Sequence, residues 1–156
     1  MLDSTGFIRR IAMFHKIMVA YDESPEADRA LESAIELTKE LHAELSIVTV
    51  IEPPPAYFSW AFSALPAVRW NDDKRRKYAL LQADARERAK AAGVWLETGL
   101  VNGDEVDSII ECAKKYGADL LILGMQQHTL LMGHTGEDVA DRSPCTLMGV
   151  PLGKSH

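Results

Sequence analysis

The sequence predicts a single α/β domain built on an open parallel five-stranded sheet with helices on both faces. Three observations lead to this fold class. Five short apolar runs, typical of buried strands, alternate with segments of helical periodicity. Pro and Gly residues stand at the boundaries, and no repeat or linker divides the 156 residues. Strands separated by helices imply right-handed crossovers and parallel pairing.

The first strand is predicted at residues 15–22, where a continuous apolar run suits a strand that is covered on both faces. Ser24 then follows as the N-cap of a helix, with Pro25 at its first position. The apolar side chains of this helix fall on one face. A second strand follows at 44–51 and is ended by the prolines at 53–55.

A long segment at 53–70, rich in aromatic residues, is predicted to be a loop. Loops of this length are often functional, which favours a lid over a site or a partner surface. Alternatively, the aromatic side chains fold back to cover the helices and the strand edge. A long helix is then predicted from Asn71 to Ala92, with Gly93 as its stop and the basic residues 74–77 on a solvated face.

The second half of the chain continues the alternation of strand and helix. The predicted elements are a strand at 94–101, a helix that follows 102–104 and ends at Gly117, a strand at 118–123 halted by Gly124, a short helix near 136–141, and a strand at 145–150. In open parallel sheets, ligands bind outside the carboxyl ends of the strands. We therefore expect any site to be built from the turns that follow the first four strands.

The composition excludes several classes of function. The formal net charge is -6, which argues against binding to nucleic acid or to an anionic membrane. No apolar run is long enough to span a bilayer. Cys112 and Cys145 are too few and too widely spaced for a disulfide framework, and they are expected as small buried apolar side chains in a reducing compartment. The sequence therefore predicts a cytoplasmic protein.

The first twelve residues are expected to form a poorly ordered extension ahead of the domain. They include Arg9 and Arg10 but lack the apolar core of a signal peptide. The folded domain is accordingly predicted to span residues 13–152.

Three motifs together resemble the universal stress protein family. They are the run from Ile17 to Ser24, the run from Gly117 to Gly124, and the closing stretch from Ser143 to Leu147. The resemblance covers about residues 14–150. It implies a Rossmann-like fold of the adenine nucleotide alpha hydrolase-like type with strand order 3-2-1-4-5. It also implies roles in stress resistance and regulation, and a homodimer that pairs through the last strand, Cys145 to Val150.

One branch of this family binds ATP through the pattern G-x2-G-x9-G-[S/T], and another branch does not bind it. Glycines of this kind let backbone N–H groups approach the phosphates. Here Gly124 matches the first glycine, Gln127 replaces the second, and Gly133 is followed by His134. Gly124 and Gly133 are nine positions apart rather than the thirteen of the pattern. The sequence therefore predicts a degenerate ATP site with weak or no affinity for ATP.

The resemblance places Ala20, Tyr21 and Asp22 beside the base and ribose, and Val50 against the base. The complete set of candidate nucleotide contacts is Ala20, Tyr21, Asp22, Val50, Gly124, Met125, Gln127, Gly133, His134 and Thr135. Asp22 has an alternative role as a cap or turn residue. His128 and His134 are candidates for phosphate donors or, with a further ligand, for a metal site; alternatively, they are surface loop residues.

Two functions follow as hypotheses. The first is a stress-response regulatory protein that binds ATP or another adenine nucleotide, with no metal beyond nucleotide-associated Mg²⁺. The second is a dimeric module that binds protein partners and does not bind ATP. Catalysis ranks last, because the sequence has no nucleophile elbow, Walker pattern, catalytic triad or metal motif.

Overall fold

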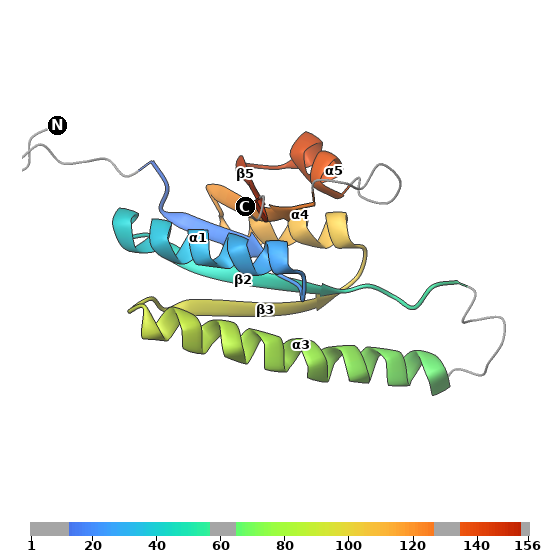
Figure 1. The fold of residues 1–156 in the computed structure, drawn as a ribbon. Coiled ribbons are helices and arrows are strands. Elements are labelled where there is room, and N and C mark those ends of the chain that lie inside the picture. Colours follow the sequence, from blue (N-terminus) through green and yellow to red (C-terminus); the bar gives the residue numbers. More distant parts are fainter. Residues whose placement is uncertain (1–12, 57–64, 127–134, 154–156) are drawn as a thin grey trace, which may run out of the picture.

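A parallel sheet lies between two layers of helices (Figure 1). The computed structural model describes residues 13–56, 65–126 and 135–153. Its elements, in chain order, are β1 (Lys16–Ala20), α1 (Pro25–Leu41), β2 (Glu44–Ile51), α3 (Leu65–Ala91), β3 (Leu96–Asn102), α4 (Glu105–Tyr116), β4 (Leu120–Met125), α5 (Thr135–Arg142) and β5 (Thr146–Pro151). No helix of the described residues combines the length and the apolarity that a membrane crossing requires.

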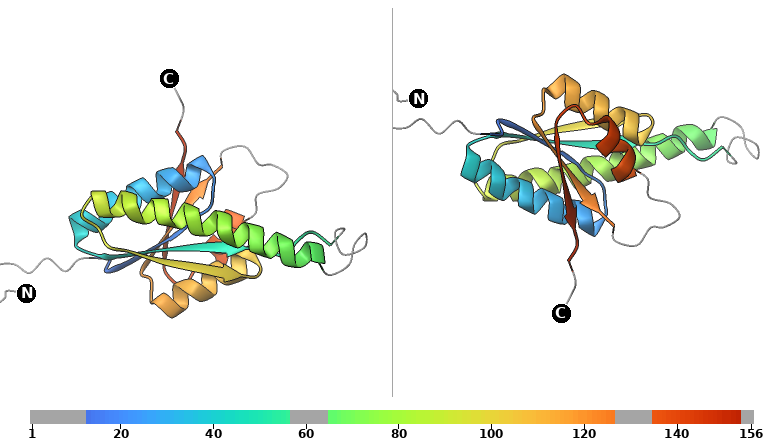
Figure 2. Two further views of the ribbon diagram at one scale, coloured as in Figure 1. Left: turned by 90° about the horizontal axis from the view of Figure 1, so that it is seen from below. Right: turned by 90° about the horizontal axis from the view of Figure 1, so that it is seen from above.

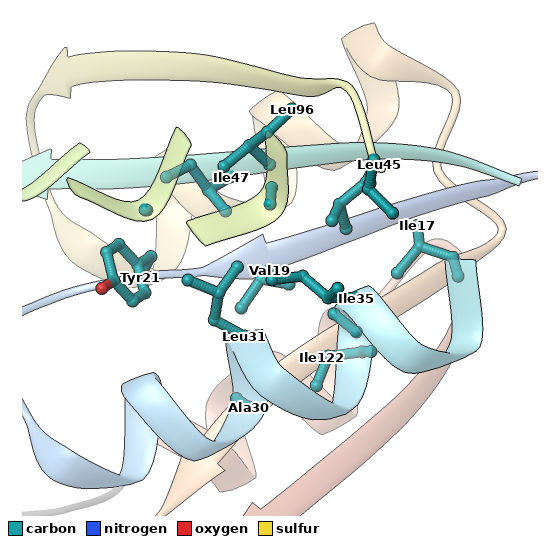
Figure 3. Packing of buried hydrophobic residues seen from close by; sticks show 14 of the residues in the cluster. Ile17, Val19, Tyr21, Ala30, Leu31, Ile35, Leu45, Ile47, Leu96 and Ile122 are labelled. Carbon is teal, nitrogen blue, oxygen red and sulfur yellow. The ribbon is translucent and has the colours of Figure 1, made fainter. Parts of the chain in front are cut away.

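The five strands are parallel and lie in the order β3-β2-β1-β4-β5, which confirms the predicted topology. Helices α1 and α3 cover one face of the sheet, and α4 and α5 cover the other (Figure 2). Between the sheet and α1, the side chains of Leu31 and Ile35 pack with those of Val19 and Ile122 (Figure 3). Two buried apolar clusters, one on each face, therefore hold the layers together.

Asp119 fixes the register between β1 and β4. Its Oδ2 accepts a hydrogen bond from the backbone N–H of His15 at 2.7 Å, and its Oδ1 accepts one from that of Lys16 at 3.0 Å. The backbone N–H of Asp119 in turn donates to the carbonyl of Lys16 at 2.9 Å. A slip of one residue would move every side chain of a strand to the other face. The carboxylate therefore sets the register at the point where the central strand begins.

Helix α3 is attached to α1 by a charged cluster around Arg88. Its Nη1 donates to Asp28 Oδ1 at 2.8 Å, and its Nη2 lies 3.6 Å from a carboxylate oxygen of Glu32. The same oxygen of Asp28 accepts a hydrogen bond from the hydroxyl of Tyr21 at 2.8 Å. Arg88 is only partly exposed, so this cluster is screened less than a fully solvated ion pair.

The helix ends follow the sequence signals. Ser24 Oγ accepts from the backbone N–H of Ala27 at 3.1 Å, and Asp104 Oδ1 accepts from that of Asp107 at 3.0 Å. Gly117 ends α4 in the left-handed conformation, with φ of 71°, which only glycine adopts without strain. The cap at Ser24 and the end of α4 at Gly117 were predicted and are confirmed, whereas Asp104 was predicted only as part of the turn before this helix. The bounds of β2 match the prediction, and the other strand and helix boundaries, apart from the start of α3, differ from it by at most two residues.

The predicted start of the long helix at residue 71 is wrong, because α3 begins at Leu65. Polar residues at 71–73 suggested an N-cap, but Asn and Asp are also tolerated on an exposed helical surface. Pro66 suits the first turn of a helix, where its missing N–H costs nothing. The predicted loop therefore ends before residue 65, and positions 57–64 of it lie outside the described residues, as does the extension at 1–12.

Replacing Asp119 tests its role in setting the register. Asp119→Ala removes both carboxylate acceptors, and we expect the free energy of unfolding to fall by about 1–3 kcal/mol, because both hydrogen bonds have a charged acceptor. Urea denaturation measures this change. The control is Asp141→Ala at an exposed position of α5, where a change below about 0.5 kcal/mol is expected. Equal effects of the two substitutions would contradict the role of Asp119.

Candidate functional site

The carboxyl ends of the strands meet at the edge of the sheet where ligands bind in folds of this kind. In Figure 1 this edge lies at the right, where β2 and β3 end. Helix α3 continues past the sheet at this edge (Figure 1). Its 27 residues span about 40 Å, whereas the seven residues of β3 span about 23 Å. The first half of α3 therefore forms one wall of the candidate site.

Small apolar side chains line part of this edge. Ala20 and Val50, both predicted to contact the base, are partly buried on the face of the sheet that α4 and α5 cover. Val101 and Val106 belong to the same apolar cluster. Side chains of this kind provide the flat apolar contact that a purine base requires. The structure therefore brings Ala20 and Val50 onto one face, and their contact with a base stays a prediction.

Tyr21 points away from this face. Its ring is 2% exposed and lies in the core beneath α1 and α3 (Figure 3). Burial and the neighbouring Asp28 carboxylate raise the pKa of its hydroxyl well above the ordinary value. Its backbone N–H donates to the carbonyl of Val48 at 2.9 Å. The side chain of Tyr21 therefore serves packing on the opposite face, as the alternation of side chains along a strand requires for two successive residues.

Asp22 occupies the turn between β1 and α1. Its Oδ1 accepts a hydrogen bond from the backbone N–H of Ser24 at 2.8 Å, and the residue is exposed. This is the turn role that the sequence offered as the alternative to ligand binding. A contact between Asp22 and a nucleotide stays a prediction.

Carboxylates gather around the same edge. Glu105, the first residue of α4, is partly buried, and this burial raises the pKa of its carboxyl group. The neighbouring carboxylates of Glu52, Asp22 and Asp104 raise that pKa further. The hydroxyl of Thr135 donates to Glu105 Oε2 at 3.2 Å and partly offsets the shift. The surroundings of Glu105 are therefore negative, and the Thr135 hydroxyl is engaged by Glu105.

Gly124 lies inside β4, where it pairs with Val150 of β5. The predicted halt of the strand before Gly124 is wrong, because β4 continues to Met125. An added Cβ at Gly124 would lie 2.5 Å from the carbonyl carbon of Glu26 and 2.7 Å from the backbone nitrogen of Ala27. The first turn of α1 therefore packs directly on this glycine, as is common where another backbone approaches a strand closely.

Met125 fills the space between β5 and α5. A Cβ added to Gly149 would lie 2.6 Å from the side chain of Met125, and a Cβ added to Gly136 would lie 3.1 Å from it. The remaining predicted phosphate contacts are Gln127, Gly133 and His134, and they lie outside the described residues, as does His128. No group of His, Cys, Asp or Glu within the described ranges is arranged to hold a metal ion.

Helix α3 brings an aromatic and basic cluster to this edge that the sequence analysis missed. The indole N–H of Trp70 donates to the carbonyl of Glu52 at 3.2 Å. The ammonium group of Lys74 lies 5.2 Å from the centre of the Trp70 ring and 5.4 Å from that of Tyr78, and Lys77 donates to Glu23 at 3.1 Å. The spacing of Trp70, Lys74 and Tyr78, four residues apart on a helix, was the signal available in the sequence.

The two cysteines are partly buried, and burial raises the pKa of both thiols. The nucleophilic thiolate is correspondingly less populated at neutral pH. Cys112 and Cys145 both pack against the apolar cluster beneath α4 and α5. Packing is therefore the role that the structure gives them.

Comparison with known proteins identifies the family. The model of the family described as "Universal stress protein family" matches residues 13–151. The chain belongs to the universal stress protein family. The fold, the strand order and the packing of α1 on Gly124 of β4 are accordingly properties of a universal stress protein.

Three relatives illustrate the similarity. Universal stress protein YxiE of Bacillus subtilis is 29% identical over an alignment of 153 positions, gaps included, which covers 87% of this chain and 98% of the relative. A universal stress protein solved in complex with cAMP is 28% identical, with a TM-score of 0.66, and the match covers 90% of this chain and 98% of that one. A family member from Arabidopsis thaliana, solved with AMP bound, has a TM-score of 0.64 at 17% identity, over 88% of this chain and 91% of that one.

Replacing Gly124 tests the close contact with α1. Gly124→Ala places a methyl group against backbone atoms that cannot rotate away, and we expect a loss of about 2–3 kcal/mol in the free energy of unfolding. Gly99→Ala is the matched control, because an added Cβ there lies at an ordinary 3.8 Å from the nearest atom, the carbonyl oxygen of Ile47. Thermal and urea unfolding measure both variants. If Gly124→Ala and Gly99→Ala had similar free energies of unfolding, the close packing of α1 on Gly124 would be contradicted.

Proposed function

We propose that this universal stress protein is a regulatory protein of the cytoplasmic stress response, and that it binds an adenine nucleotide weakly through the base. The proposal rests on the side chains at the edge of the sheet where the strands have their carboxyl ends, which we call the ligand edge. The apolar side chains of Ala20 and Val50 suit a base, whereas the carboxylates of Asp22, Glu52 and Glu105 repel phosphate. Binding and regulation, not catalysis, are its proposed activities.

The relative solved with cAMP supports the ligand class, since it is 28% identical over nearly the whole chain. Its ligand has one phosphate, whereas ATP has three. Each further phosphate brings more negative charge towards the carboxylates of this edge. ATP would therefore be at a disadvantage here, except where nucleotide-associated Mg²⁺ offsets part of its charge. The contact with α1 is a sufficient reason for the glycine at position 124, so Gly124 by itself is no evidence for a phosphate loop.

Nucleotide titration with adenosine, cAMP and ATP tests this proposal. By isothermal calorimetry we expect adenosine and cAMP to bind with comparable affinity, and ATP to bind no more tightly than adenosine. Glu105→Gln keeps an acceptor for Thr135 but removes one charge from the edge. We expect this variant to bind cAMP and ATP about three- to tenfold more tightly and adenosine unchanged, since one screened charge contributes about 1 kcal/mol.

Glu111→Gln is the control, because this residue is exposed on α4 and pairs with Lys115.

The stability of the Glu105→Gln variant gives a second test. The raised pKa of Glu105 means that ionisation costs the folded state free energy, so this cost appears as the pH rises above about 4.5. Glu105→Gln should therefore gain stability at pH 7 and show no gain at pH 4. Low-micromolar ATP affinity with far weaker adenosine binding would contradict the proposal.

A second function, as a dimeric module that binds protein partners, is favoured by the two borders of the sheet. At the β3 border, Gln82 of α3 donates to the carbonyl of Gly99 at 2.7 Å and to Thr49 Oγ1 at 2.9 Å. Arg86 of α3 donates to the hydroxyl of Thr98. Side chains of α3 therefore use part of the hydrogen-bonding capacity of β3, although residues 98–101 of this strand are themselves only partly buried. The other border is β5, whose Leu147, Met148 and Val150 are only partly buried.

An edge strand of this kind is prone to pairing with another chain. We propose that two copies pair through residues 145–150 in a symmetric contact. Light scattering at micromolar concentration should then give about twice the monomer mass of 17.3 kDa. Thr146→Lys adds charge at an exposed position of β5 and should shift the population towards monomer, whereas Ala91→Lys at the end of α3 should not. A stable monomer of the native chain would exclude this dimer.

A further inference from the structure

The first half of α3 is attached to the end of β2 at the ligand edge. The indole N–H of Trp70 donates to the carbonyl of Glu52 at 3.2 Å. Glu52 follows Val50 by two positions, which is about 7 Å of extended chain. The side chains of α3 around Trp70 therefore lie next to the part of the ligand edge where the proposed function places the base.

Lys74 is held at this place by two aromatic rings. Its ammonium group lies 5.2 Å from the centre of the Trp70 ring and 5.4 Å from that of the Tyr78 ring. Tyr78 is itself only 8% exposed, so its ring is fixed by packing. Burial and the neighbouring carboxylates of Glu23 and Asp22 raise the pKa of the Tyr78 hydroxyl well above its ordinary value, which places this hydroxyl beside the turn after β1. The ammonium group therefore lies between the end of β2 and that turn.

The N–H donors of Lys74 are available to a ligand. The next lysine of α3, Lys77, donates to Glu23 at 3.1 Å and is thereby engaged. Among the described residues, Lys74 makes only the two ring contacts, which leave its N–H donors without an acceptor. Cation–π contacts also restrict the movement of a long side chain, so less freedom is lost when a ligand binds. Lys74 is therefore a positioned donor at the base end of the ligand edge.

Glu52 supplies an acceptor at the same end of the edge. After burial, its carboxylate raises the pKa of Glu105 the most, which places this carboxylate at the ligand edge. Glu52 is exposed, and within the ranges that the structure describes no ion pair joins it to Lys74. Neither side chain is therefore neutralised by the other. An acceptor and a donor, one from the end of β2 and one from α3, both stay available to a base.

Adenine presents the complementary pattern along its edge. Its exocyclic amine is a donor, and the ring nitrogens that flank this amine are acceptors. Hypoxanthine, the base of inosine, has a carbonyl oxygen where adenine has the amine. In the same orientation this oxygen faces the carboxylate of Glu52, and two acceptors without a proton between them lose a hydrogen bond. A carboxylate and an ammonium group at this end of the edge therefore favour adenine over a purine with a carbonyl group.

We propose that Glu52 and Lys74 select adenine at the ligand edge, where the carboxylate of Glu52 accepts from the exocyclic amine and the ammonium group of Lys74 donates to a flanking ring nitrogen. This inference rests on the proposed function, because it requires a base that lies against Ala20 and Val50. The apolar side chains contact the face of the base, and the two charged side chains contact its polar edge. Water competes for both hydrogen bonds at this exposed position, so each contributes a moderate factor to the affinity.

Calorimetry on the full chain with adenosine and inosine tests this selection. We expect inosine to bind the native chain about tenfold more weakly than adenosine. Lys74→Met removes the ammonium group but keeps an unbranched side chain over the two rings, and adenosine should bind it about three- to tenfold more weakly. Lys74→Arg keeps N–H donors and should recover most of the native affinity. Glu52→Gln adds an amide donor beside its acceptor, so it should bind inosine nearly as well as adenosine.

Deaza analogues of adenosine, each of which lacks one ring nitrogen that flanks the amine, identify the atom that Lys74 contacts. We expect one analogue to bind the native chain about as weakly as adenosine binds Lys74→Met. Lys74→Met should bind that analogue and adenosine alike, because the hydrogen bond is already lost. Lys90→Met and Glu87→Gln are the matched controls, since both residues are exposed near the other end of α3. Both should keep the native affinity and the native preference for adenosine.

The selection of adenine by these two residues is overturned if the native chain binds inosine as tightly as adenosine. It is also overturned if Lys74→Met keeps the native affinity for adenosine, or if Glu52→Gln keeps the native preference. In each of these cases adenosine still binds, so the proposed function stands without the selection. If the native chain binds neither adenosine nor cAMP, the proposed function is wrong and the selection of adenine is wrong with it.

Discussion

The packing of the first turn of α1 on Gly124 is the contact on which the ligand edge depends. The backbone atoms of Glu26 and Ala27 come so close to β4 that no side chain fits between them. This contact holds the N-terminus of α1 at the end of β4 and thereby fixes the turn that carries Asp22 and Ser24. Beyond Gly124, Met125 fills the space next to Gly149 and Gly136, so β5 and α5 are placed by the same segment of β4.

Ion pairs between α3 and α1 help to fix the position of α3. Arg88 joins α3 to Asp28 and Glu32 of α1, and the hydroxyl of Tyr21 completes the cluster. With the end of α3 held there, its first half has to continue past the sheet, because it is much longer than β3. Trp70 and Lys74 reach the ligand edge for this reason. A partly exposed ion-pair cluster on one face of the sheet thus helps to determine which side chains stand beside a site at its end.

The sequence was a good guide to local structure and a weaker guide to the site. The helix ends at Ser24, Asp104 and Gly117 could be predicted from the sequence, because a cap acts on its own helix. The start of α3 was not readable, because Asn71–Asp73 and Pro66 both suit a helix start and only tertiary packing chooses between them. Gly124 shows the same limit. A glycine is required both where a phosphate approaches a backbone and where a helix does, and only the structure shows that α1 approaches here.

The hydrogen bonds from Gln82 to β3 also bear on how large an assembly of this sheet can become. A parallel sheet with two open borders can add strands at both, and identical copies then grow into a filament. Here the carbonyl of Gly99 in β3 already accepts a hydrogen bond from the amide of Gln82, which is 6% exposed and also bonds to Thr49. A strand that paired with β3 at this carbonyl would have to compete with that buried amide. One buried glutamine therefore disfavours growth of the sheet at the β3 border.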